Sequence, residues 1–213
     1  LNGVKALSKE RVLSELLKIL KIENFFKLND SKELMEIFLL IFPELKYLNR
    51  FKNFSLTRNY IKNSEILLLS ILLIDLKDNH EYFCHKYKVS NKTRDNLKLL
   101  GSKFKELQTD KEFFKKNLKN NAYNMGLSNL KILFTLNLLN KKKISNKEIS
   151  IYKVIDKISI PKFPFDGKFL LKKGVQEGKK IGIILNEAEK IWVNNNFNLS
   201  PKDFETIIKK NTI

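Results

Sequence analysis

The chain has 213 residues, 43% hydrophobic and 11% aromatic, a composition that predicts a folded core and excludes a disordered basic tail. Forty-one Lys plus Arg stand against twenty-three Asp plus Glu, and the formal net charge of +18 favours a polyanionic partner such as RNA, DNA or an anionic membrane. A codon bias toward Lys would enrich Glu as well, so codon bias alone does not explain the excess of basic over acidic residues. We therefore expect a nucleic-acid partner.

A single cysteine, Cys84, excludes an internal disulfide and suits a reducing cytosol, so a cytoplasmic protein is expected. The longest apolar run, residues 66–74, is far shorter than the ~20 residues that span a bilayer. The first residues have no apolar signal-peptide core, and no basic helix with aromatic anchors stands out, so no membrane partner is expected. The sequence begins with Leu rather than Met, which predicts a processed product or the downstream part of a longer protein. The oligomeric state stays open.

Helical periodicity dominates the chain, and serines mark most of the predicted helix starts. Ser8 is expected to cap a helix with an apolar stripe, and Ser31 a second helix that Pro43 ends. A helix over residues 65–76 has almost no polar positions, so it is predicted to lie at the centre of the core.

The pattern continues through the next eighty residues. Ser90 begins a helix with Leu and Phe at helical spacing, and residues 127–139 form another strongly apolar helix. Capping boxes are predicted at Thr109 with Glu112 and at Ser145 with Glu148. No convincing strand or hairpin pattern occurs. The predicted fold is all-α, an irregular array of roughly eight to ten helices.

One loop differs in composition from the rest of the chain. Residues 158–167, ISIPKFPFDG, contain Pro161 and Pro164, which forbid a regular helix. We interpret the loop as a link between a helical body and a smaller C-terminal module. The expected segments are residues 1–60, 61–157 and 158–213.

Signatures of catalysis and of metal binding are missing. The possible zinc ligands Asp75, Asp78, His80, Cys84 and His85 lie close together, but their spacing matches no closed Cys/His pattern. We interpret this segment as a solvated helix end and expect no metal site. No Gly-x-Ser-x-Gly motif, phosphate-binding loop, dinucleotide fingerprint or extended Asp-x-Asp pair occurs, so no catalytic residue and no cofactor is assigned to this chain.

Four of the seven glycines lie between residues 167 and 182. We predict a short helix over 167–173, a left-handed cap at Gly174 and a second helix from Gly178 to Trp192, whose first amides point at an anion. The alternative is packing alone, in which Gly178 and Gly182 allow another helix to come close. The predicted RNA-binding residues are Lys168, Lys172, Lys173, Gly178, Lys179 and Lys180.

Several segments, in collinear order, carry a resemblance to a known family. They are SKERVLSELLKIL (8–20), IFPEL (41–45), ILLLSILLIDLKD (66–78), YKVSNKTRDNLKLL (87–100) and FPFDGKFLLKKGVQEGKKIGIILNEAEKIWVNNNF (163–197). Together they resemble the neck end, body and tail of the bacterial class II tRNA nucleotidyltransferases and poly(A) polymerases. One departure is Phe169, where the family usually has Asp.

The resemblance implies that residues 1–60 are the neck end and start of the body, with an RNA-binding role, 61–157 the body and 158–213 the tail. It also implies that the chain holds a tRNA acceptor arm and elbow by the phosphate backbone, for an enzyme that adds CCA or A to RNA 3′ ends. Mg²⁺ and ATP or CTP would belong to a catalytic head that this chain lacks. Structural roles are implied for Ser8, Glu10, Arg11, Gly174, Gly182 and Trp192.

The residues also leave a different class of function open. A non-enzymatic all-helical adaptor, or a DNA-binding regulator, would account for the same charge if most lysines are simply solvated. A regulator would prefer one duplex sequence at raised salt, because base contacts specify a site whereas phosphate contacts only position the protein.

Overall fold

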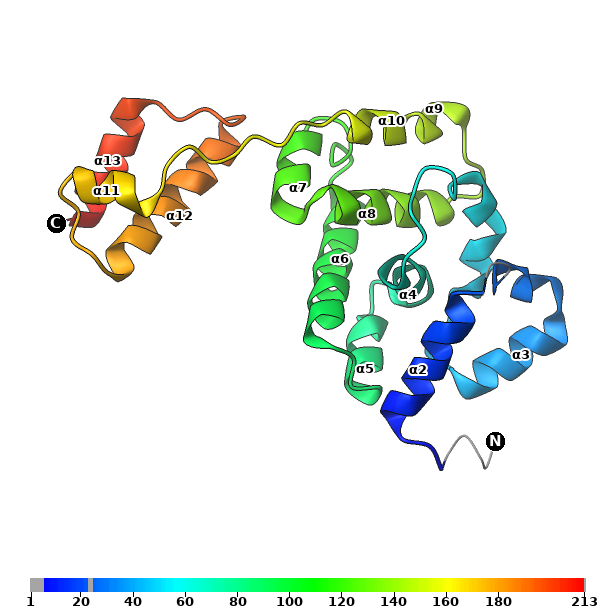
Figure 1. The fold of residues 1–213 in the computed structure, drawn as a ribbon. Helices are drawn as coiled ribbons and strands as arrows, with labels where there is room; N and C mark the ends of the chain where they lie inside the picture. Colours follow the sequence, from blue (N-terminus) through cyan, green and yellow to red (C-terminus); the bar gives the residue numbers. More distant parts are fainter. Residues whose placement is uncertain (1–5, 23–24, 213) are drawn as a thin grey trace. The chain divides into compact units, whose positions relative to one another are not determined.

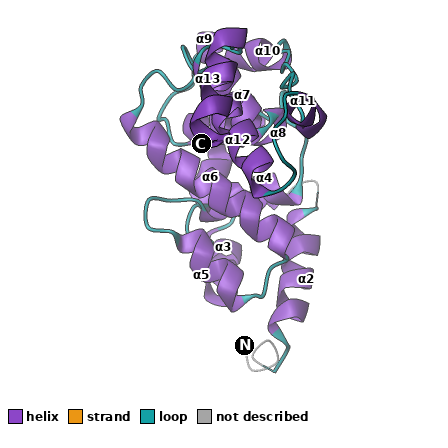
Figure 2. Ribbon diagram, turned by 90° about the vertical axis from the view of Figure 1, so that its left-hand side faces the viewer, coloured by secondary structure: helices purple, strands orange, loops and turns teal. Residues whose placement is uncertain are grey.

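A computed structural model describes residues 6–22 and 25–212, so residues 1–5 of the predicted first segment lie outside the described part. The described residues form helices and loops with no strand, and the predicted all-α fold is confirmed (Figure 2). The chain divides into two compact units, residues 1–116 with 125–157 and residues 117–124 with 158–213. The division of residues 1–157 at residue 60 stays a prediction.

Of the described helices before residue 158, the first unit contains all but one. In chain order they are α2 (Lys9–Leu20), η1 (Phe25–Asp30), α3 (Lys32–Ile41), η2 (Leu48–Leu56), α4 (Glu65–Leu73), α5 (Asn79–Lys86), α6 (Asn91–Thr109), α8 (Leu127–Leu139), α9 (Asn146–Ile149) and α10 (Ile151–Asp156), where η marks a 3-10 helix. The predicted caps Ser8, Ser31 and Ser90 are confirmed, because each hydroxyl accepts a hydrogen bond from the amide three residues further on.

Helix α4 forms the centre of the first unit. Every residue from Leu67 to Leu73 is buried, and α2, α5, α6, α8 and η2 all contact the helix (Figure 1). Fully burying a Leu or Ile side chain contributes roughly 1.5–3 kcal/mol, so this run is a major source of stability. The predicted core position of the apolar run is confirmed.

The predicted end of this helix at residue 76 is wrong. The helix ends at Leu73, Ile74 is extended, and the side chain of Leu76 is 56% exposed. The Asp75 carboxylate accepts hydrogen bonds from the amides of Lys77 and Asn79, at 2.9 and 3.1 Å. These local side-chain bonds compete with the helical ladder and turn the chain into α5.

Of the two predicted capping boxes, one is confirmed and one is wrong. Ser145 and Glu148 satisfy each other's backbone amides at 2.8 and 3.3 Å. Thr109 instead is the last residue of α6, and its hydroxyl donates to a carbonyl within that helix. The Glu112 amide donates to Asp110 at 2.8 Å, because this carboxylate stands nearer to it than the Thr109 hydroxyl in sequence.

A buried arginine satisfies the carboxyl end of α4. Arg50 is only 4% exposed, and its Nη1 donates to the carbonyls of Ile71 and Ile74 at 2.8 and 2.9 Å. Its Nε donates to Asn140 at the end of α8, at 3.2 Å, and its guanidinium carbon lies 4.0 Å from the ring centroid of Tyr47. Burial lowers the pKa of Arg50 to about 10, so the group is still charged at pH 7.

The second unit is built from the remaining helices, α7 (Leu118–Met125), α11 (Gly167–Lys172), α12 (Lys179–Asn194) and α13 (Pro201–Thr212). The loop before α11 has no helix, as its two prolines predict. Apolar side chains from α11, α12, α13 and the loop after α11 form the core. Its buried members are Leu170, Val175, Ile184, Ala188, Phe204 and Ile207.

Replacing Arg50 by Met should lower the free energy of unfolding by about 3 kcal/mol, because two buried carbonyls lose their donor at roughly 1–3 kcal/mol each. Urea unfolding followed by circular dichroism measures this change. Lys52→Met, an exposed neighbour on η2, is the matched control and should stay within about 0.5 kcal/mol of wild type. Equal stability of the two variants would show that Arg50 does not hold α4.

Glu148→Gln should destabilise the protein by about 1 kcal/mol at pH 7 and by progressively less below pH 4.5. The ion pair with Lys141, and then the bonds from Ser145, lower the pKa of Glu148 from 4.5 to about 2. A lowered pKa stabilises the folded state above pH 4.5, and this stability is lost as the pH falls toward 2. Urea unfolding of both proteins between pH 7 and pH 3 measures the difference, and a difference independent of pH would contradict the prediction.

Candidate nucleic-acid interface

The six predicted RNA-binding residues lie on one segment of the second unit, from the first turn of α11 to the first turn of α12. All six are exposed. Lys173 forms an ion pair with Glu205, with 3.6 Å between Nζ and Oε1. The other four lysines have no ion pair with any described residue, so their charges are available to a ligand.

Gly174 ends α11 in the left-handed region, with φ 84°. Its amide donates to Leu171 at 3.0 Å, and the Val175 amide donates to Leu170 at 3.1 Å, which together make a Schellman motif. Leu170 and Val175 also meet in the core. The predicted cap is confirmed, and it fixes the direction in which the chain leaves α11 toward α12.

Helix α12 starts at a glycine that offers no cap to its first amides. Gly178 has φ 134° and ψ −161°, a region that is essentially restricted to glycine. The Ile181 amide donates to the Gly178 carbonyl at 3.2 Å, whereas the amides of Lys179 and Lys180 have no acceptor among the described residues. Bare amides and the positive end of the helix dipole favour an anion at this point.

Close packing does not explain Gly178 and Gly182, so the predicted packing role is wrong. A Cβ added at either position would have no heavy atom within 4 Å outside its own local backbone. The backbone conformation accounts for Gly178. Gly182 lies one turn further along α12 and is exposed. Because it has no side chain, the backbone near the amino end of the helix stays uncovered at this position.

Trp192 is buried in the second unit and contacts three aromatic rings. The ring centroids of Tyr123, Phe163 and Phe197 lie 5.5, 5.3 and 4.9 Å from its own. Phe169, the departure from the family pattern, packs in a similar way against the ring of Phe204, at 5.5 Å. An aspartate could not make this contact, so phenylalanine at position 169 contributes to the packing of the core of the second unit.

The residues around the start of α2 have local partners in the first unit. The Ser8 hydroxyl accepts the hydrogen bond from the amide of Arg11, whose own side chain is exposed. Glu10 forms an ion pair with Lys88 at 3.0 Å, after the end of α5. Its backbone hydrogen bond and then Lys88 lower the pKa of Glu10. Glu10 thus links α2 to the turn that follows α5.

The predicted solvated helix end at residues 75–85 is wrong for three of the five possible zinc ligands. His80 and Cys84 are buried where α5 packs against α6, and Asp75 is buried in the turn before α5. Burial raises the pKa of the Cys84 thiol to about 11 and lowers the pKa of His80, so both side chains are neutral at pH 7. A protonated thiol is a poor nucleophile and a poor metal ligand.

The five possible zinc ligands of the sequence do not gather at one point. The structure brings together Asp78 and His80 with Glu81, a residue outside the predicted five. The sequence pattern that indicates Glu81 is its spacing of three residues from Asp78. This spacing places both carboxylates within one turn of the start of a helix.

Comparisons with known proteins identify no family for this chain. No protein-family model matches the sequence, and no curated protein is similar to it. Among the described residues, no helix is both long and apolar enough to cross a membrane. The resemblance to tRNA nucleotidyltransferases therefore stays a prediction from the quoted motifs.

Gly178→Ala should destabilise the second unit by about 2 kcal/mol, because a Cβ strains its backbone conformation. Gly182→Ala, four residues away in regular helix with open space around it, should instead stabilise by about 0.5–1 kcal/mol. Thermal unfolding of both variants measures these opposite effects. A loss of stability in Gly182→Ala would restore the packing explanation.

Proposed function

We propose that the chain binds RNA by its phosphate backbone, and that the amino end of α12 with the surrounding lysines is a principal contact. The observation that carries the proposal is the exposed start of α12, where two amides lack acceptors and two lysines add full charges. A phosphate accepts hydrogen bonds from such amides and is attracted by both the dipole and the ammonium groups.

The approach to this helix end is open as well as positively charged. Neither Gly178 nor Gly182 has a side chain that would hold a backbone phosphate away. Lys168 and Lys172 on α11 add two further charges within the same segment of chain. Contacts of this kind give affinity without reading sequence, which suits the recognition of an RNA by its shape.

The motif order supports tRNA as the RNA. In the family that the sequence resembles, body and tail hold the tRNA while a separate catalytic part uses Mg²⁺ and nucleoside triphosphates. The proposal therefore assigns RNA binding to this chain and leaves the addition of nucleotides to a catalytic part that the sequence does not contain.

Lys179→Glu combined with Lys180→Glu should weaken tRNA binding by about tenfold or more, since two attractive charges become repulsive beside the phosphate. The slope of log affinity against log salt should fall by about one to two, because fewer counterions are released on binding. Fluorescence anisotropy with labelled tRNA at several salt concentrations measures both quantities.

The matched control is Lys142→Glu with Lys143→Glu, which makes the same charge change just after the carboxyl end of α8, where the helix dipole disfavours an anion. This control should lose less affinity and keep its salt slope. Equal losses in the two double variants would mean that net charge alone drives binding. Competition with random duplex DNA tests the alternative of a DNA-binding regulator, which requires DNA to displace tRNA at equal concentration.

A further inference from the structure

His80, near the start of α5, has an unusual hydrogen-bonding state. The residue is 2% exposed, and its Nδ1 is the one buried side-chain nitrogen or oxygen without a hydrogen-bond partner among the described residues. Leaving such an atom unpaired costs roughly 1–3 kcal/mol, and native proteins contain few such atoms. The unpaired nitrogen therefore points to a missing partner.

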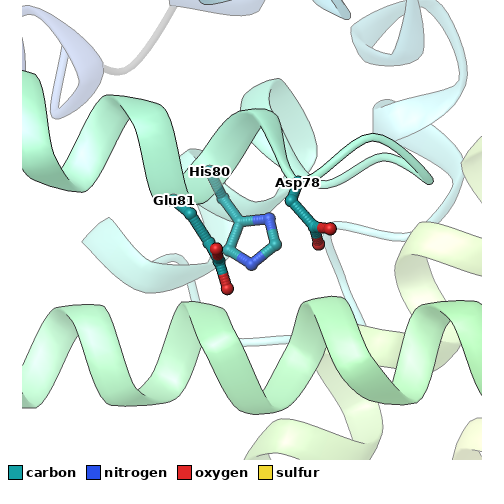
Figure 3. A group of neighbouring side chains, drawn as sticks. All are labelled: Asp78, His80 and Glu81. Atoms are coloured by element: carbon teal, nitrogen blue, oxygen red, sulfur yellow. The ribbon is translucent and has the colours of Figure 1, made fainter.

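Two carboxylates flank this imidazole. Asp78, His80 and Glu81 each offer one ligand atom, and these atoms lie within 4.8 Å of one another. Figure 3 shows the ring of His80 between the carboxylates of Asp78 and Glu81. A partner that satisfies a neutral imidazole nitrogen and two carboxylates together is a cation.

The position of the ring is fixed by the neighbouring helix. A Cβ at Gly101 on α6 would lie 2.4 Å from Cε1 and 2.6 Å from Nε2 of His80, so only glycine admits the imidazole here. Asp78, before the first residue of α5, has φ 57°, a conformation that is uncommon for a residue other than glycine. Its side chain does not cap the helix and forms an ion pair with Lys105 of α6.

The two carboxylates of the cluster reach solvent, whereas the imidazole is buried. A groove of about 520 Å³ beside the cluster is lined by His80 and Glu81, together with Arg94 and Lys98 of α6, and Asp78 lies outside its lining. Glu81 is exposed, and the Asp78 side chain is 41% exposed. Both carboxylates can therefore rotate toward the ring. Bonds of 2.0–2.1 Å in tetrahedral zinc sites put ligand atoms roughly 3.4 Å apart, so the ligand atoms, which lie within 4.8 Å of one another, need to close by up to about 1.4 Å.

We propose that Asp78, His80 and Glu81 bind a divalent transition-metal ion of the zinc class. One imidazole with two carboxylates suits Zn²⁺ better than Mg²⁺ or Ca²⁺, which take oxygen ligands alone. The ion displaces the Lys105 ammonium from Asp78. Three protein ligands leave one tetrahedral position for water, as in open zinc sites. This site lies in the first unit and does not depend on the proposed RNA binding.

Calorimetric titration of the full chain with Zn²⁺ should show saturable binding of one ion per chain. Glu81→Gln, a change at an exposed side chain that preserves the fold, should weaken binding at least about tenfold, since even outer-shell changes weaken metal sites by 10–100-fold. His85→Ala removes an exposed histidine outside the cluster and is the matched control, with unchanged affinity. Zn²⁺ should also raise the melting temperature of wild type.

Lys105→Met gives a test of opposite sign. It removes the cation that competes for Asp78, so zinc should bind more tightly by several-fold, a gain that misfolding cannot produce. The proposal is overturned if wild type shows no saturable binding, or if Glu81→Gln binds as tightly as wild type. A larger loss in His85→Ala than in Glu81→Gln would assign zinc to the exposed histidine instead. Unchanged or weaker binding in Lys105→Met would exclude Asp78 and with it the three-ligand site.

Discussion

The buried carboxyl end of α4 is the constraint on which the first unit depends. A helix that is apolar on every face has to be surrounded, and its last carbonyls then cannot reach water. Arg50 donates hydrogen bonds to these carbonyls, so η2, which carries Arg50, has to pass the carboxyl end of α4. Asn140 accepts from the same guanidinium, which places the end of α8 here as well. Tyr47 stacks on Arg50 and donates to Asp75 at 3.1 Å. Asp75 in turn starts the turn into α5, so the end of one helix positions the start of the next.

Features that depend on neighbouring residues could be predicted from the sequence. A serine hydroxyl and an amide three residues away decide a helix start, so Ser8, Ser31 and Ser90 were sufficient signals. The errors at Asp75 and Thr109 arose where a carboxylate accepts from the amide two residues further on. At Asp75 this bond competes with the helical ladder, and after Thr109 the Asp110 carboxylate takes the amide that a threonine cap would have used. The sequence does not say which bond forms. The placement of α7 in the second unit depends on contacts such as that of Tyr123 with Trp192, far along the chain, which no local pattern encodes.

Glycines serve two physical roles in this chain: a positive φ at a helix end and close packing inside a helix. The sequence indicates the first role more clearly than the second. Gly174 and Gly178 stand at helix ends, where positive φ is expected, and their place in the pattern was informative. Gly101 stands inside α6, where glycine costs about 1 kcal/mol relative to alanine, a cost that itself indicates a packing reason. The sequence does not indicate which residue packs against Gly101. The structure shows that it is His80, so the glycine required by close packing lies outside the glycine-rich stretch.

The two proposed sites follow opposite electrostatic requirements, and the net charge of +18 affects them differently. A polyanion is attracted by the summed field of many lysines, so its binding is expected to weaken as salt screens charges beyond about 8–10 Å. A small cation is repelled by that same field, and a site for it has to rely on ligand atoms in direct contact. Asp78, His80 and Glu81 each offer one such ligand atom, and these atoms lie within 4.8 Å of one another. Because direct coordination is screened far less, the cation site depends on local geometry, whereas the RNA contact depends on the charge of its surroundings.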